Sequence, residues 1–263
     1  MQITDKYYDG ERPLYESRDL RLERVTIGEG ESGLKESRHI VALDCCFEGM
    51  YVIWECEDVE CKNCTFEKDS RASLWYVRGL RMDNCRIRSV KPLREIKELT
   101  INHLRINRGA ESFWFCRNGE INHLQITKGE YAFFHSENLQ INRLHLQGKY
   151  TFQYTKGIEI HDAVLDTKDA FWNSEDCTIY DSEIRGEYLG WYAKNLRLVR
   201  CRISGTQPLC YCENLVIEEC SFAPDADRAF EKSFVKATII GEITSVVNPI
   251  PGSEIANSKL ETP

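Results

Sequence analysis

An apolar position recurs every 19 to 21 residues through most of this 263-residue chain. Each occurrence lies two residues after a smaller apolar residue, so the repeat carries a fixed local pattern. A period of this length is typical of a solenoid, in which every turn buries its face only against its neighbours. The recurring residues are Ile27, Phe47, Phe66, Ile87, Ile106, Ile126, Leu146, Leu165, Ile184, Ile203 and Phe222.

Within one period, apolar and polar residues alternate. Leu99, Ile101, Leu104 and Ile106 show the pattern, in which residues two apart share one face of a strand and the step of three marks a corner. Asn, Asp and His tolerate the left-handed backbone that such a corner needs. The corner pairs are Asp83-Asn84, Asn102-His103, Asn122-His123, Asn142-Arg143 and His161-Asp162.

Two further corners complete a three-sided turn, with a third short strand such as residues 112–115 between them. One corner precedes the first strand and holds Asp19, Asp58, Gly79, Asn118, Asn138, Gly157, Asp176, Asn195 and Asn214. The other follows the second strand and holds Gly49, Gly109, Gly129, Gly148, Gly186 and Gly205, where glycine would supply a positive φ. A leucine-rich repeat is the alternative architecture, but no segment shows the helical period that it requires.

Four segments carry a resemblance to known families: KDAFWNSE (168–175), GEYLGWY (186–192), SGTQPLCYCENL (204–215) and SVVNPIPG (245–252). They resemble an uncharacterised bacterial domain-of-unknown-function family, and the repeat resembles the pectate lyase-like fold. The resemblance implies an all-β, single-stranded right-handed parallel β-helix with three short strands per turn and about 11 turns. It implies no reaction. One domain is expected over 1–263, with 1–19 as N-terminal cap, 20–243 as coils and 244–263 as C-terminal cap or tail.

Composition narrows the partners and the compartment. The formal net charge of −8 argues against nucleic acid, which is bound through clustered Lys and Arg. The N-terminal segment lacks the apolar run of an export signal, and no apolar stretch reaches the roughly 18 residues of a membrane span. We therefore expect a cytoplasmic protein without membrane contact, whose twelve cysteines stay thiols.

Two patterns invite a metal interpretation. Cys61-x-x-Cys64 has the spacing of half a zinc site or a redox pair, but both residues fall on core positions that Ile101 and Leu104 hold elsewhere. His103 and His123 share a corner column without a third ligand. We interpret the cysteines as core packing and expect neither a metal nor a cofactor.

The third strand holds two columns of opposite orientation, because neighbouring strand residues point to opposite faces. One column is wholly apolar and contains Ile53, Leu74, Leu93, Phe113, Phe133, Phe152, Phe171, Gly190 and Leu209. The other contains Trp54, Trp75, Arg94, Trp114, Phe134, Gln153, Trp172, Trp191 and Cys210. Burying Arg94 and Gln153 unpaired would be costly, so the tryptophan column is expected to face outward as a binding surface. In the alternative, the phenylalanines face outward with Tyr131, Tyr150, Tyr154, Tyr188 and Tyr192.

Two classes of function fit these features. The leading interpretation is a non-catalytic scaffold whose aromatic face binds a protein partner, a second copy or a ligand; residues 1–17 or 244–263 could instead cover that face. The alternative is an intracellular carbohydrate-binding or carbohydrate-active protein, with aromatic rings against sugar and loop carboxylates acting on it. Its candidate catalytic residues are Lys168, Asp169 and Glu187, which lie on successive loops.

Overall fold

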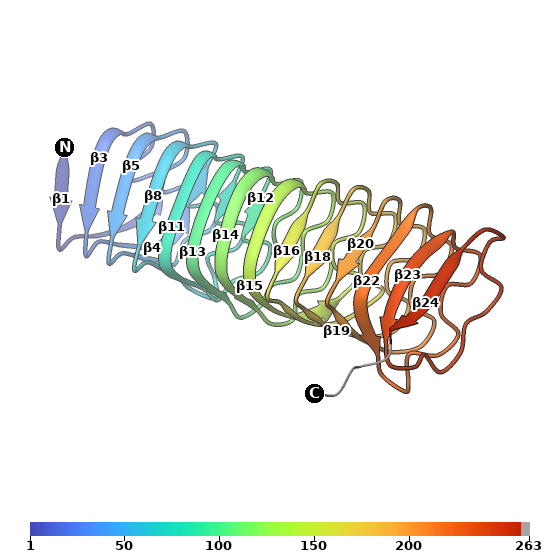
Figure 1. Ribbon diagram of the computed structural model, residues 1–263. Coiled ribbons are helices and arrows are strands. Elements are labelled where there is room, and N and C mark those ends of the chain that lie inside the picture. The colour runs from blue at the N-terminus through green and yellow to red at the C-terminus, as the bar shows by residue number, and fades with distance from the viewer. Residues whose placement is uncertain (259–263) are drawn as a thin grey trace, which may run out of the picture. The chain divides into compact units, whose positions relative to one another are not determined.

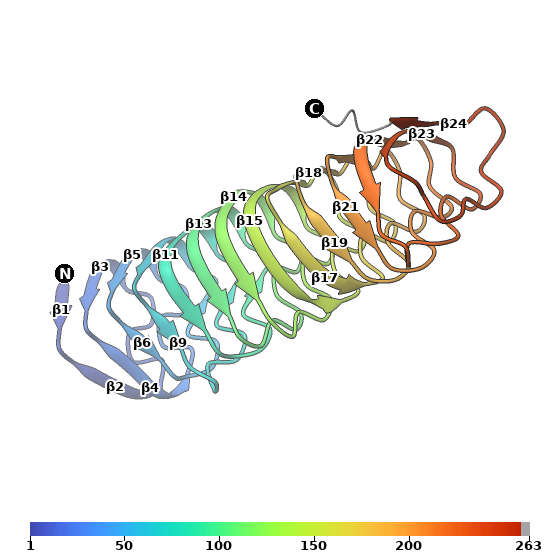
Figure 2. The same cartoon turned by 60° about the horizontal axis from the view of Figure 1, so that its bottom comes forward.

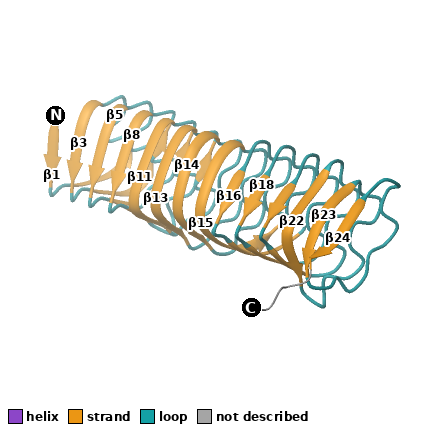
Figure 3. Cartoon of the chain, in the orientation of Figure 1, coloured by secondary structure: helices purple, strands orange, loops and turns teal. Residues whose placement is uncertain are grey.

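The computed structural model describes residues 1–258, and this part of the chain consists of strands and loops without a helix (Figure 3). Contacts divide the chain into two compact units, residues 1–133 and 134–263. Within the described residues each unit is a parallel β-solenoid, and these residues make about 13 turns in all. The all-β solenoid is therefore confirmed and the leucine-rich repeat is wrong, while the prediction of a single domain stays a prediction.

In unit 1, strands of successive turns pair in parallel and in chain order (Figures 1 and 2). The first side is formed by β1 (Gln2–Thr4), β3 (Arg18–Glu23), β5 (Arg38–Leu43) and β8 (Glu57–Lys62). The second side is formed by β2 (Tyr7–Glu11), β4 (Thr26–Glu31), β6 (Cys46–Phe47) and β9 (Thr65–Phe66). Three longer strands pass through the corner and serve both sides: β11 (Arg78–Ile87), β13 (Lys97–Ile106) and β14 (Arg117–Ile126).

Unit 2 repeats this arrangement. Its first side contains β15 (Glu137–Lys149), β16 (Glu159–His161), β18 (Thr178–Tyr180), β20 (Arg197–Val199), β22 (Leu215–Phe222), β23 (Val235–Ile240) and β24 (Glu254–Ser258). Its second side contains parts of β15 and β22 together with β17 (Val164–Lys168), β19 (Glu183–Arg185) and β21 (Arg202–Ser204). Consecutive strands stay in register, so each side chain lies beside its counterpart in the next turn.

Left-handed residues form the corners where the sequence predicts them. All nine residues assigned to the corner before the first strand have positive φ, from Asp19 at 51° to Asn214 at 54°. Asn84, His103 and His123 at the next corner are also left-handed, with φ of 49°, 54° and 56°. Both sets of corners are therefore confirmed.

The glycine corner follows a different rule. Gly186 and Gly205 have φ of 136° and 100°, as expected, but Gly49 and Gly109 do not adopt positive φ. A Cβ on Gly109 would lie 2.3 Å from a methyl group of Ile126, and one on Gly49 would lie 2.9 Å from the Gly28 carbonyl oxygen. The prediction of positive φ is wrong at these two positions, because glycine is needed there for the close approach of a neighbouring turn, the next one at Gly109 and the preceding one at Gly49.

The third side forms regular strands only in part of unit 1. These are β7 (Ile53–Trp54), β10 (Leu74–Trp75) and β12 (Leu93–Arg94). In unit 2 the third side is a run of turns in which every second residue is left-handed, as at Asp169, Phe171 and Asn173 with φ of 55°, 61° and 54°. Its backbone stays paired, since Asp169 N–H donates to the Glu187 carbonyl and Phe171 N–H to that of Thr151, both at 2.9 Å. The prediction of three short strands in every turn therefore holds only where β7, β10 and β12 form, and elsewhere the third side is a run of turns.

The apolar column of the third side lies in the core. Phe113, Phe133, Phe152 and Phe171 are completely buried. Phe113 and Phe133 stack at 4.6 Å between ring centroids, and Phe152 and Phe171 stack at 4.8 Å with an interplanar angle of 4°. The alternative that turned these phenylalanines outward is wrong, because the ladder places like rings of successive turns face to face inside the coil.

Cysteine and asparagine columns also repeat from turn to turn. Cys61 and Cys64 are buried, which confirms their place in the core. The Cys64 thiol donates to the Ala42 carbonyl of the preceding turn at 3.3 Å, so these buried donors have acceptors. On the surface the Asn84 amide donates to Asn63 Oδ1 at 2.9 Å, and Asn63 donates to Asp44 Oδ1 at the same distance. These side chains form an amide ladder along the solenoid.

The chain ends extend the sheets within the described residues. β1 and β2 pair with β3 and β4, and β24 pairs with β23. Residues 2–11 and 254–258 therefore continue the turns instead of lying across the aromatic columns, which contradicts self-cover by these segments. Residues 259–263, the rest of the proposed C-terminal tail, lie outside the described part.

Replacing Phe171 tests the buried ladder. Phe171→Ala should lower the free energy of unfolding by about 3–5 kcal/mol, because a fully buried ring is replaced by a cavity. Phe171→Leu should cost below about 1.5 kcal/mol, since Leu74, Leu93 and Leu209 occupy the same column elsewhere. Urea unfolding followed by circular dichroism measures both, and equal small losses would contradict a rigidly packed ladder.

Alkylation tests the cysteine columns. Burial raises the pKa of Cys56, Cys116 and Cys212 to about 12, so at about pH 8 these thiols carry almost no reactive thiolate. Of the twelve cysteines only Cys46 is not fully buried. Iodoacetamide should therefore modify Cys46 alone in the native protein and all twelve residues in guanidinium chloride, as counted by mass spectrometry. Cys46→Ser should abolish the native reaction, and a pair that stays protected after unfolding would contradict free thiols.

Candidate functional site

The tryptophan column faces outward. Trp54, Trp75, Trp114, Trp172 and Trp191 are half-buried, and Arg94 is half-buried between them in unit 1. Gln153 is more deeply placed, at 9% exposure, and Cys210 is buried. The predicted orientation of the tryptophans is thus confirmed, although the column is a partly covered ladder and not a row of free rings.

Tyrosines flank this column on the same side. Tyr76 and Tyr131 in unit 1 are 38% and 40% exposed, and Tyr154 and Tyr192 in unit 2 are both 46% exposed. In unit 2 the rings form one cluster: Tyr188 lies 5.4 Å from Trp191, and Tyr192 stacks on Tyr211 at 5.0 Å. Six outward rings together are called the unit 2 aromatic face: Tyr154, Trp172, Tyr188, Trp191, Tyr192 and Tyr211.

Stacking along the solenoid covers the ring faces. Trp172 and Trp191 lie 5.5 Å apart with an interplanar angle of 6°, and Trp54 and Trp75 lie 5.1 Å apart. Arg94 takes the place of a ring, with its guanidinium carbon 4.9 Å from the Trp75 ring centroid and 5.0 Å from that of Trp114. These cation–π contacts explain how an arginine is accommodated in an aromatic column. The tryptophans therefore offer mainly their edges to solvent.

The indole N–H groups have a structural task that sequence reasoning missed. Trp75, Trp114, Trp172 and Trp191 each donate to the carbonyl oxygen 16 or 17 residues later, at 2.7 or 2.8 Å. The acceptors are Lys91, Tyr131, Tyr188 and Gln207, and all four are left-handed. Gln153 donates in the same way to the carbonyl of left-handed Asp169, at 3.3 Å. The column therefore supplies a donor to the irregular backbone of the following turn.

The three candidate catalytic residues come together in only one pair. Lys168 Nζ lies 2.8 Å from Glu187 Oε2 and 5.0 Å from the ring centroid of Tyr188. The hydrogen bond that Lys168 donates to Glu187 raises the pKa of Lys168, which keeps the lysine charged and makes it a poorer general base at neutral pH. Asp169 is buried, and desolvation raises the pKa of its carboxyl group. Their catalytic role stays a prediction.

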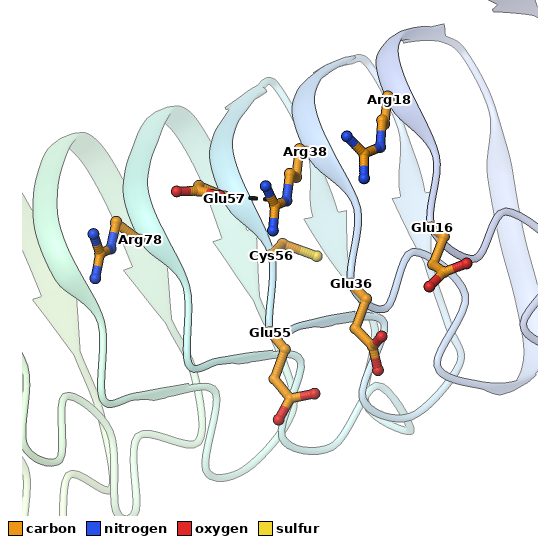
Figure 4. Close-up of a pocket in the computed structure, with 8 residues that line it drawn as sticks. All are labelled: Glu16, Arg18, Glu36, Arg38, Glu55, Cys56, Glu57 and Arg78. Atoms are coloured by element: carbon orange, nitrogen blue, oxygen red, sulfur yellow. Dashed lines mark ion pairs between the residues drawn. The ribbon is translucent and has the colours of Figure 1, made fainter.

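A polar groove of about 470 Å³ lies elsewhere in unit 1 (Figure 4). Arg18, Arg38 and Arg78 line it together with Glu16, Glu36, Glu55 and Glu57, and Arg38 Nε lies 3.4 Å from Glu57 Oε2. Its charges are nearly balanced, so they compensate one another without a ligand.

His103 and His123 stack at 4.3 Å between ring centroids. Within residues 1–258, no three His, Cys, Asp or Glu side chains are grouped so that they could hold a metal ion. In the same part of the chain, no helix is long and apolar enough to cross a membrane.

Comparisons with known proteins give a family and a distant structural neighbour. A family model described as "Protein of unknown function (DUF3737)" matches residues 1–262, which confirms the resemblance to a family of unknown function. No match is found among curated proteins. One solved structure, HetL, a pentapeptide repeat protein involved in heterocyst differentiation regulation from the cyanobacterium Nostoc sp. strain PCC 7120, is 9% identical over 81% of this chain and 82% of its own, with a TM-score of 0.33. The pectate lyase-like resemblance stays a prediction.

Gln153 allows a test of the donor role of the outward column. Gln153→Met keeps the length of the side chain but removes the amide donor, and we expect a loss of about 1 kcal/mol in the free energy of unfolding. Gln153→Trp should restore a donor and be neutral or stabilising, because four other turns use an indole N–H at this position. Urea unfolding measures both variants, and a neutral Gln153→Met would contradict the assignment.

Proposed function

This chain belongs to the DUF3737 family of proteins of unknown function, and we propose that it is a non-catalytic solenoid scaffold that pairs with a second copy through the unit 2 aromatic face. The observation that carries the proposal is the cluster of part-exposed rings around Trp191, Tyr192 and Tyr211, with the exposed Tyr154 two turns before Tyr192. Tyr and Trp are enriched in the buried centres of protein interfaces, where an apolar ring and a polar group are both used. A cytoplasmic location remains part of this proposal.

A row of alternating charges beside the aromatic face supports self-association. One register column holds five charged residues of alternating sign, and the backbone of each forms a parallel β-bridge with the next. They are Glu137, Lys156, Glu175, Lys194 and Glu213. Lys156 and Lys194 follow Tyr154 and Tyr192 by two residues, so the charged row runs along the edge of the face. Four side chains of this row are about half exposed or more and can meet a partner: Lys156, Glu175, Lys194 and Glu213.

This alternation is complementary to its own reversed copy. A two-fold axis in the interface, perpendicular to the direction in which turns stack, brings the row against itself running the other way. If the axis passes between Glu175 and Lys194, each Glu175 faces Lys194 of the second copy, and each Lys156 faces Glu213. The rings would then meet as matching surfaces, with opposite charges at the rim fixing the register.

The carbohydrate alternative has less support from the geometry. Aromatic binding of sugar requires an exposed ring face, whereas Trp172 and Trp191 cover each other. The rings therefore suit edge contacts with a protein better than flat stacking on a pyranose.

Charge reversal tests the dimer with a built-in rescue. Lys194→Glu should convert a dimer into a monomer in light scattering after size exclusion, because two Glu–Glu contacts replace two opposite-charge contacts. Glu175→Lys combined with Lys194→Glu restores alternation between the facing residues and should restore the dimer.

The controls use the exposed tyrosines. Tyr154→Ser with Tyr192→Ser should weaken the dimer about tenfold or more, as expected when anchor rings are lost. Tyr7→Ser, at a 60% exposed tyrosine of unit 1, should not change it. A wild-type chain that stays monomeric at high micromolar concentration would overturn the proposal, and glycan binding by such a monomer would favour the carbohydrate alternative.

A further inference from the structure

Several charges on successive turns of unit 1 are matched by opposite charges. Arg24 Nε lies 2.7 Å from Asp5 Oδ1, Arg88 Nη1 lies 3.0 Å from Glu67 Oε1, and Lys91 Nζ lies 2.8 Å from Glu111 Oε1. Each pair joins residues 19 to 21 positions apart, which is one turn. Like charges also meet in register elsewhere, as Arg18 and Arg38 do, but glutamates line the groove into which those arginines point. A position where cations meet and no carboxylate lines the site therefore draws attention.

The matching fails around a second pocket of unit 1. The pocket has a volume of about 430 Å³ and is lined by Lys68, Arg86, Arg88, Arg105, Asn107 and Arg108, five cations and no carboxylate. Lys68 and Arg88 have acidic neighbours in Asp69 and Glu67. Arg86, Arg105 and Arg108 have no ion-pair partner within the described part of the chain.

The strand register forces two of these arginines together. Arg86 on β11 and Arg105 on β13 are direct register partners on paired parallel strands. Buried neighbours on either side, such as Cys85 and Ile87, turn Arg86 to the surface, and Leu104 and Ile106 do the same for Arg105. Neighbouring strands lie about 4.8 Å apart, and like charges directly opposite each other are destabilising.

We propose that this pocket binds a phosphate dianion, either free or as a monoester of a small molecule. Guanidinium groups bind phosphate oxygens in a bidentate fork, and two adjacent forks can hold one phosphate. A dianion neutralises most of the unpaired charge of Arg86, Arg105 and Arg108, which a monocarboxylate would not. The Asn107 amide adds a neutral donor, and the volume falls in the range of about 300–1,000 Å³ that is usual for small-ligand pockets.

The pocket suits a small anion better than a polynucleotide. Its cations occupy three successive turns of a chain whose net charge is −8, and the other groove of unit 1, lined by Arg18, Arg38 and Arg78, is neutralised by four glutamates. Nucleic-acid binding requires a longer basic track along the phosphate backbone. Lys68 and Arg108 lie in the connections after the second strand, where a solenoid can change residues without disturbing its core.

Isothermal titration of the full chain at constant ionic strength tests the site. Inorganic phosphate and phenyl phosphate are the probes, and chloride is the competing background ion. We expect saturable binding in the micromolar to millimolar range; binding of both probes assigns a monoester pocket, and binding of inorganic phosphate alone assigns a free-phosphate pocket. No saturable heat with either probe would overturn the proposal.

Matched variants separate the site from general electrostatics. Arg86→Gln with Arg105→Gln should weaken phosphate binding about tenfold or more, whereas Arg18→Gln with Arg78→Gln removes the same charge from the balanced groove and should leave it unchanged. Without phosphate, the Arg86 and Arg105 variant should melt at the same or a higher temperature than the wild type, because a repulsion has been removed. Equal weakening by both variants, or a lower melting temperature of the first, would contradict a dedicated anion site.

Discussion

Parallel pairing in register governs each unit, because it places every side chain beside its counterpart one turn away. Strands about 4.8 Å apart leave no room for a mismatched neighbour, so each column must be compatible with itself. Flat rings meet this condition by stacking, as Phe152 and Phe171 do. Amides meet it by donating along the column, as Asn84 does to Asn63, and charges meet it by alternating in sign, as at Lys156 and Glu175.

The same condition explains why the tryptophan column both stabilises the backbone and forms part of the surface. The third side uses alternating left-handed residues, whose carbonyl groups are not all served by regular sheet pairing. Trp114 and Trp172 donate to such carbonyl groups in the following turn, which fixes the rings in place. Rings held in this way are rigid, and a rigid aromatic surface loses little conformational entropy when a partner covers it.

The corners and the core could be predicted because they depend on one residue at a time. Asn, Asp and Gly at the corner before the first strand each favour a left-handed backbone whatever their neighbours are, and alternation places the phenylalanine column inside. Gly109 was misassigned because its role depends on the methyl group of Ile126 in the next turn. The Trp172 hydrogen bond to Tyr188 and the pairing of Lys168 with Glu187 also join different turns. Contacts of this kind are set by the exact length of each turn, which a periodic pattern gives only within one or two residues.

Because most columns of side chains are compatible with themselves, a column that departs from this rule gives information about what the surface binds. The alternating row from Glu137 to Glu213 satisfies its own column and, since reversing it and moving it by one turn gives the opposite sign at each place, satisfies a second copy as well. Arg86 and Arg105 do the reverse, because their column repels itself and is completed only by an anion from outside. In a solenoid of this kind, columns that are complementary when reversed favour a partner of the same chain, whereas columns with uncompensated charge favour a small ligand of the opposite sign.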